Sequence, residues 1–174
     1  MISKEQLHSI MPNATKENLE KFCQPLNETM EKYNINTPQR MACFLAQLAH
    51  ESGCLRYVRE LADGKAYENR KDLGNFVPGD GTKYKGRGLI QITGRNNYVA
   101  LGRALGQDLV NHPELLEGPV YASLSAGWFW DSRKLNESAD VMDFVRITKR
   151  INGGTNGMED RLKYFALAKT AFGI

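Results

Sequence analysis

The 174-residue chain has 41% hydrophobic and 25% charged side chains, the composition of an ordinary globular protein with one domain and a substantial core. It contains no run of eighteen or more apolar residues, which excludes a membrane-spanning helix of ordinary length. The formal net charge of +3 is too small to indicate nucleic-acid binding.

The amino-terminal sequence and the cysteines indicate where the chain is made. Residues 1–6 lack the apolar core of a secretory signal, so we expect a chain that stays in a cytosol unless another system exports it. The three cysteines, an odd number without an obvious pairing pattern, are expected to be reduced thiols.

Two helices are expected before residue 37. Ser3 and Gln6 form a capping-box pattern that starts a short helix extending to about Met11. Thr15 caps a second helix, ending near Tyr33, whose apolar residues recur at helical spacing. Residues 1–36 contain no repeat that would form a separate binding domain. We expect them to pack on residues 37–174 within a single domain.

The third helix organises the rest of the chain. Thr37 followed by Pro38 predicts its first turn. Its apolar stripe consists of Met41, Phe44, Leu45 and Leu48. The same stripe reaches Glu51, and Gly53 suits a left-handed helix end. Burial and the negative end of the helix dipole both disfavour the charged form of this carboxyl, as a general acid requires. From the pattern alone, a boundary glutamate whose carboxylate reaches water is the simpler interpretation.

The central segment is polar and rich in glycine. Residues 54–61 fit either a helix or a strand, and residues 62–85 are expected to form a functional loop with room for a short hairpin. Alternation along residues 86–93 sends Gln91 and Thr93 to one face, where an amide and a hydroxyl suit sugar or water binding. An edge strand with a polar face is the alternative. Thr93 is also expected to cap the next helix, which ends at Gly106.

Helices dominate the remainder of the chain. Pro113 opens a short turn and Pro119 opens a longer helix. A further apolar stripe runs from Val141 to Ile151, and residues 162–172 form the last one. We therefore expect a mainly α, two-lobed fold with a small polar loop or β excursion and a cleft between the helical lobes.

The positive charge is concentrated in the middle of the sequence. Residues 56–103 contain ten Lys or Arg and five Asp or Glu, a net charge of +5, and the remainder has 13 basic and 15 acidic residues, a net charge of −2. The excess indicates either a solvated surface or a mild attraction for an anionic substrate.

The candidate chemistry centres on two carboxylates. Glu60 follows Glu51 by nine residues, beyond the glycine that ends the helix, so a turn could place the two across a cleft. Two carboxylates in different environments are the arrangement that glycoside hydrolysis uses. His50 and Cys54 lack a second pair of ligands, so no metal is expected, and we expect His50 to hydrogen-bond a neighbour and fix the end of the helix.

Several ordered motifs from Thr37 to the carboxyl terminus resemble the family 19 glycoside hydrolases, in particular the compact endolysins of phages and prophages. They are FLAQLAHESG at 44–53, YVREL at 57–61, YKGRGLIQITGR at 84–95 followed by Asn97-Tyr98, and RINGG at 150–154. The resemblance implies a lysozyme-like fold and an inverting hydrolysis with Glu51 as general acid and Glu60 as general base. Thr93 would help to hold the attacking water.

The resemblance also assigns positions that contact the substrate and implies neither a metal nor an organic cofactor. The candidate substrate-binding residues are His50, Tyr84, Arg87, Gln91, Asn97, Asn152 and Arg161. Two features differ from plant chitinases, which have a longer spacing between acid and base and carry a substrate-binding lysine where this chain has Leu124. Both differences argue against chitin.

The leading hypothesis is therefore a monomeric muramidase-type endolysin that cleaves β-1,4 bonds of bacterial peptidoglycan. A chitinase on the same scaffold is the nearest alternative, and a non-catalytic glycan-binding module or an injected effector are others. As an endolysin, the protein would wait in the host cytoplasm and reach the wall after a holin or another pore opened the membrane. No nucleic-acid partner is expected.

Overall fold

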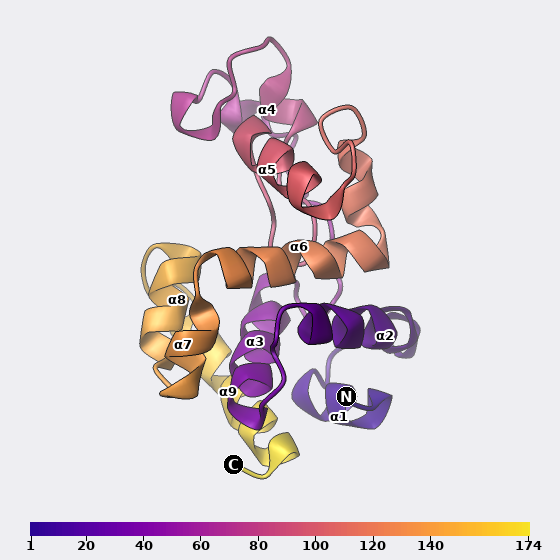
Figure 1. Ribbon diagram of the computed structural model, residues 1–174, viewed down its shortest axis with the longest axis vertical. Helices are drawn as coiled ribbons and strands as arrows, with labels where there is room; N and C mark the ends of the chain where they lie inside the picture. Colours follow the sequence, from indigo (N-terminus) through magenta and orange to yellow (C-terminus); the bar gives the residue numbers. More distant parts are fainter.

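A computed structural model describes all residues, 1–174, and shows a mainly helical protein in two lobes (Figure 1). The larger, lower lobe contains α1 (Lys4–Ile10), α2 (Lys16–Lys32), α3 (Pro38–Glu51), α6 (Pro119–Ser132), α7 (Leu135–Asp140), α8 (Phe144–Asn152) and α9 (Met158–Phe172). The upper lobe contains the 3₁₀ turns η1 (Lys65–Tyr67), η2 (Lys71–Leu73) and η3 (Pro113–Glu117) with α4 (Asp80–Lys83) and α5 (Arg95–Leu105). The mainly α, two-lobed architecture expected from the sequence is confirmed.

The first three helices begin where the sequence predicts. Ser3 and Gln6 form a complete capping box on α1, and the side chain of Thr15 caps α2. Thr37 caps α3 by accepting a hydrogen bond from the backbone N–H of Arg40 at 3.2 Å, with proline in the first turn. α1 packs on α9, and α2 packs on α6, so residues 1–36 belong to the lower lobe.

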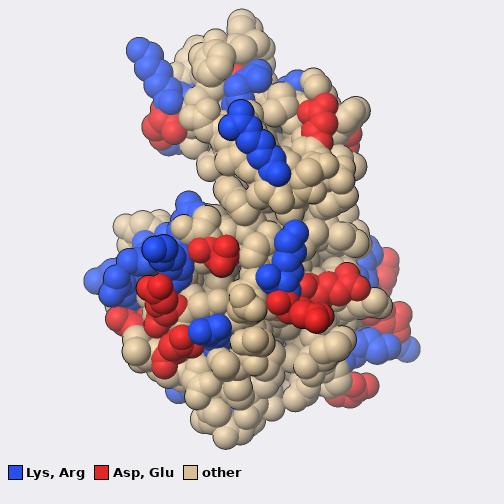
Figure 2. Space-filling model, viewed as in Figure 1, with Lys and Arg blue, Asp and Glu red and all other residues tan.

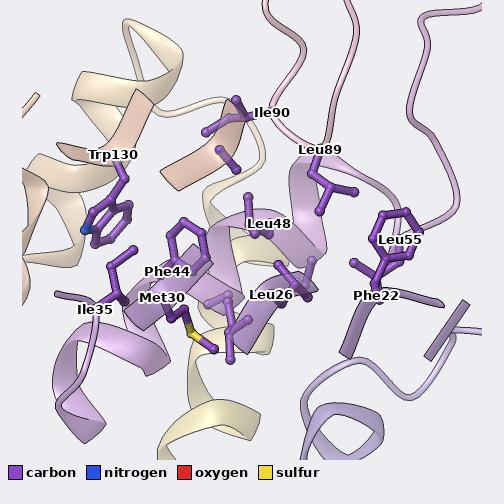
Figure 3. Close-up of a cluster of buried hydrophobic side chains, with 14 of the residues drawn as sticks. Phe22, Leu26, Met30, Ile35, Phe44, Leu48, Leu55, Leu89, Ile90 and Trp130 are labelled. Atoms are coloured by element: carbon purple, nitrogen blue, oxygen red, sulfur yellow. The ribbon is translucent and has the colours of Figure 1, made fainter. Parts of the chain in front are cut away.

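α3 is the central helix of the lower lobe. Residues 42–49 are all buried, because α9, α7, α1 and α8 all contact this helix. Phe44 meets Trp130 of α6 edge to face, with ring centroids 5.3 Å apart (Figure 3). The single apolar stripe expected from the sequence therefore understates the burial of this helix. The rigid surroundings fix the position of Glu51, its last residue.

A left-handed turn carries the chain from α3 toward the upper lobe. Gly53, Cys54 and Leu55 all have positive φ, at 57°, 57° and 69°, which is rare for residues other than glycine. The Ser52 hydroxyl stabilises the turn by accepting from the Leu55 N–H at 2.9 Å and donating to the Leu48 carbonyl at 2.6 Å. Residues 54–61 thus form neither of the regular elements expected from the sequence.

The segment 86–93 is a tight turn, and the alternating strand expected from the sequence is wrong. Antiparallel bridges join Arg87 to Arg59 and to Ile92, while Gly88 and Gln91 have positive φ. Leu89 and Ile90, at the tip of the turn, are both buried and point into the core beside Leu48 (Figure 3). Two consecutive apolar side chains share the buried side because the left-handed residues break the alternation.

Thr93 does not cap the following helix. α5 begins at Arg95, and Gly94, with φ at 93°, occupies the N-cap position without a side-chain cap. The Thr93 hydroxyl instead donates to the carbonyl of Gln91 at 3.0 Å. No helix in the structure combines the length and the apolar character needed to cross a membrane.

Candidate active site

A cleft of about 280 Å³ lies between the two lobes and contains both candidate carboxylates. Its lining residues are Glu51, Tyr57, Arg59, Glu60, Leu61 and Gln91. The surface narrows to a hollow between the lobes (Figure 2). The left-handed turn after α3 and the bridge between Arg59 and Arg87 bring Glu51 and Glu60 to this cleft.

Glu51 enters the cleft from the lower lobe and is held by an arginine. Its Oε1 accepts from Arg161 Nη2 at 2.6 Å, and its side chain is 21% exposed. Arg161, on α9, is itself buried and also donates to Gln47 on α3 and to the carbonyl of Asn156. Gln47 in turn donates to Thr148 of α8 at 2.9 Å. This network fixes the carboxyl from three helices.

Arg161 corrects two expectations drawn from the sequence. The sequence placed Glu51 in an apolar stripe, whereas the structure sets the Arg161 guanidinium against its carboxyl group. Arg161 was expected to contact sugar directly, but its side chain is 1% exposed and each of its nitrogens already binds a protein oxygen. It is therefore a positioning residue for Glu51.

His50 fixes the end of α3, as the chemical argument from the sequence expected. Its Nδ1 lies 2.7 Å from Asp160 Oδ2 on α9. Its ring packs against Gly157, where an added Cβ would lie 2.3 Å from a ring carbon and where φ is 73°. Any larger residue at 157 would displace the ring. The direct substrate contact also considered for His50 finds no support in this arrangement.

Glu60 enters the cleft from the other side and has different partners. Its Oε1 accepts from the Gly86 N–H at 2.6 Å, and its Oε2 accepts from the Tyr67 hydroxyl at 3.1 Å. Burial, and then the hydrogen bond to Glu60, raise the pKa of Tyr67, so this phenol stays protonated and donates at neutral pH. Sequence reasoning missed Tyr67, because nothing in the polar loop distinguished it from the other residues there.

Gln91, Thr93 and Asn97 gather around the backbone that holds Glu60. An added Cβ on Gly86 would lie 2.8 Å from Gln91 Oε1 and 3.3 Å from Thr93 Oγ1. Asn97 Nδ2 donates to the carbonyl of Thr93 at 2.8 Å. The expectation that Gln91 and Thr93 lie together is thus met, although a tight turn and not a strand brings them there.

Tyr84 and Arg87, expected to bind substrate, lie inside the wall of the upper lobe. Tyr84 is fully buried, and its hydroxyl donates to the carbonyl of Val110 at 2.8 Å. Arg87 pairs with Glu117 at 3.0 Å and donates to the Tyr98 hydroxyl. Both expectations are corrected, because buried groups with these partners cannot reach a sugar. Asn152, the last residue of α8, is half-buried.

The family model described as chitinase class I, of glycoside hydrolase family 19, matches residues 29–149. The chain belongs to glycoside hydrolase family 19. A family 19 domain-containing protein of Haemophilus influenzae is 34% identical, over 95% of this chain and 94% of that protein. An endochitinase of Arabidopsis thaliana is 38% identical over 79% of this chain, but the match covers only half of the plant protein.

Solved structures share the fold of this family 19 enzyme along its whole length. Chitinase C from Streptomyces griseus superimposes with a TM-score of 0.81 at 25% identity, covering 99% of this chain and 76% of that one. A class IV family 19 chitinase from Zea mays gives a TM-score of 0.80 at 22% identity, covering 99% and 93%. The enzyme is a glycoside hydrolase with the two-lobed fold of its family.

Replacing Thr93 tests its role in this family 19 enzyme. Thr93→Val should lower kcat with little change in KM, because the proposed role of the hydroxyl is to hold the attacking water. Thr93→Ser should keep most of the activity, since it retains the hydroxyl. Steady-state kinetics on a defined oligosaccharide measure both variants. If Thr93→Val and the unmodified enzyme had equal kcat values, the hydroxyl would have no part in catalysis. Its role would then be limited to the hydrogen bond that it donates to the Gln91 carbonyl.

Replacing Arg161 tests the positioning of Glu51. Arg161→Met should lower the free energy of unfolding by roughly 3–5 kcal/mol, because it leaves Glu51 and Gln47 without their buried partner. It should also reduce kcat, whereas Arg161→Lys should recover part of the stability but less of the activity, since ammonium lacks the planar fork. Urea denaturation and kinetics measure the two effects. The control is Arg103→Met, at an exposed position on α5. If the control lost as much stability and activity as Arg161→Met, Arg161 would not be the positioning residue for Glu51.

Proposed function

We propose that this family 19 enzyme hydrolyses β-1,4 bonds between N-acetylated amino sugars and inverts the configuration at the anomeric carbon. The observation that carries the proposal is that Glu51 and Glu60 line one cleft from opposite lobes and have different partners. An inverting mechanism needs an acid on one side of the sugar and a base with a water on the other. Their carboxyl groups should lie roughly 6.5–9.5 Å apart.

The partners of the two carboxyls suit these two roles. Arg161 binds Oε1 of Glu51, so Oε2 is the oxygen that can carry a proton to the leaving glycosidic oxygen. Glu60 accepts two hydrogen bonds, from Gly86 and Tyr67, which orient its carboxylate to take a proton from water. The Thr93 hydroxyl lies close to Gly86, and its proposed role is to help orient that water.

Chitin-type chains are the first candidate substrate, because the plant relatives are named endochitinases and the similar solved structures are chitinases. Peptidoglycan is the second candidate, and Arg59 favours it. This arginine lines the cleft with 59% of its side chain exposed, and its contact with Glu117 is long, at 3.7 Å. Glu117 is already paired with Arg87, so Arg59 offers a cation that neutral chitin would not use.

Digestion of both polymers tests the proposal. Purified sacculi and chitin oligosaccharides are incubated with the enzyme, and the products are analysed by mass spectrometry. Reducing ends from chitin alone, from sacculi alone, or from both would identify the substrate. Anhydro ends from sacculi would indicate a lytic transglycosylase and contradict hydrolysis. Binding without any new ends would indicate a glycan-binding module.

For the peptidoglycan candidate, we also propose the delivery expected of an endolysin. A membrane would separate the enzyme in a producing cell from the wall, and a pore such as a holin would admit it. Expression with and without a co-expressed pore tests this proposal. Lysis that depends on the pore supports it, and equally prompt lysis without the pore contradicts it.

A further inference from the structure

Part of the positive charge of residues 56–103 is paired with acidic side chains in the folded protein. Several arginines of the basic central segment are neutralised in the fold: Arg70 pairs with Asp72, Arg95 with Asp80, and Arg87 with Glu117. The Arg95 guanidinium lowers the pKa of Asp80, which keeps that pair charged. Five other cations of this segment, Arg56, Lys71, Lys83, Lys85 and Arg103, form no ion pair.

A second group of cations without an ion pair lies at α8. The α8 basic face, as we call it, consists of Arg146, Lys149 and Arg150 of α8 together with Arg133 and Lys134 of the junction between α6 and α7. Arg133 is half-buried, with its guanidinium over the Phe129 ring. None of these residues forms an ion pair within 4.0 Å, and α8 itself contains no acidic residue. Arg150 donates to the carbonyl of Arg133 at 2.9 Å, which ties the two segments together.

The acidic residues nearest in sequence do not cancel this charge. Asp140 is bound by Arg40 of α3 at 2.7 Å, and Asp143 caps α8 by accepting from the Arg146 N–H. Asp131 and Glu137 are the other acids of the two helices before α8. On α9, which follows α8, Asp160 contacts His50 at 2.7 Å, and Glu159 lies in the first turn without an ion pair. A cluster of basic side chains is visible on the left of the lower lobe, in the region of α7 and α8 and below the hollow between the lobes, with acidic side chains beside it (Figure 2).

The face lies next to the catalytic end of α3. α8 ends at Asn152, and the loop that follows supplies the Asn156 carbonyl to Arg161 and Gly157 to the ring of His50. At 1.5 Å per residue, Arg150 to Arg146 lie roughly 3–9 Å along the helix from Asn152. A glycan strand that fills the cleft and leaves it over the carboxyl-terminal end of α8 would pass within reach of the long side chains of the α8 basic face.

We propose that the α8 basic face binds the carboxylates of the stem peptides carried by a peptidoglycan strand in the cleft. This proposal rests on the peptidoglycan candidate for the function. Guanidinium groups bind carboxylates in a planar, bidentate manner, and lysine adds a mobile point charge. The face would select a substituted, anionic glycan, whereas a neutral chitin chain would gain nothing from it.

Sedimentation with sacculi tests the proposal apart from catalysis. The protein carries Glu51→Gln throughout, so that it binds without cutting. On this background, the triple variant Arg146→Gln, Lys149→Gln, Arg150→Gln is compared with a control, Lys4→Gln, Lys16→Gln, Lys21→Gln. The control removes the same charge from exposed positions on α1 and α2. Both are tested on intact sacculi and on sacculi whose free carboxylates have been converted to uncharged amides by carbodiimide coupling to methylamine.

The α8 variant should bind intact sacculi about tenfold more weakly than the background, and the difference should shrink as salt screens the charges. Binding to the amidated sacculi should be the same for the α8 variant and the background, and the control should bind as the background does. The proposal is overturned if the control loses as much, if the α8 variant loses as much on amidated as on intact sacculi, or if the background does not bind intact sacculi. Chitin hydrolysis by the unmodified enzyme reports separately on the proposed function.

Discussion

Replacing Glu51 with glutamine is expected to leave a folded enzyme whose hydrolysis is about two to four orders of magnitude slower, the usual cost of losing a general acid. The amide oxygen can still accept from Arg161, so the network that joins α3, α8 and α9 is retained. The amide cannot donate an acidic proton to the leaving oxygen. Release of reducing ends measures the loss, and circular dichroism verifies the fold.

Glu159→Gln is the matched control for this change. Glu159 is an exposed residue in the first turn of α9, two residues before Arg161, and it forms no ion pair. Its replacement should leave the rate unchanged. If Glu51→Gln cleaved at the unmodified rate, Glu51 could not be the acid, and the cleft would need another proton donor.

Glu60→Gln is expected to be similarly disabling, by about two to four orders of magnitude, because an amide cannot accept the proton of the attacking water. The fold should survive, since the Gly86 N–H can still donate to the amide oxygen. Glu60→Ala removes the side chain and opens space beside Gln91. Added azide, which attacks without a base, should then recover part of the activity and yield a glycosyl azide.

Glu68→Gln is the control for Glu60→Ala, because it alters the polar loop of the upper lobe without removing the proposed base. Glu68 accepts from the N–H groups of Gly79 and Gly81 in the same lobe, and these bonds lower its pKa. Its replacement disturbs the loop without touching the base, so azide should have no effect on it. Rescue of both variants, or a fully active Glu60→Gln enzyme, would show that Glu60 is not the base.

Local signals in the sequence were sufficient for the starts of the first three helices and for the choice of the two carboxylates. Ser3, Thr15 and Thr37 cap their helices through neighbours three residues away, so the chain itself encodes those starts. Glu51 and Glu60 are separated by a short segment, and the motifs around them are distinctive. The burial of α3 could also be expected in part, because its apolar spacing is regular.

Contacts between distant segments were not predictable in the same way. Arg161 is 110 residues from Glu51, and no local pattern shows that a buried arginine will meet that carboxyl. Cys54, Leu55 and Gln91 adopt left-handed conformations because surrounding bonds fix them, not because of their own preferences. Charge density along the sequence was similarly misleading, since Arg87 and Arg95 find partners only in the folded chain.

The configuration of the first product tests the central claim most directly. The unmodified enzyme is mixed with a β-1,4-linked oligosaccharide that it cleaves, and proton NMR follows the anomeric signals before mutarotation. Single displacement by a water held at Glu60, with Glu51 as acid, predicts that the α-anomer appears first. A β-anomer as the first product would mean retention of configuration and would contradict the mechanism in which Glu51 and Glu60 act together with one water.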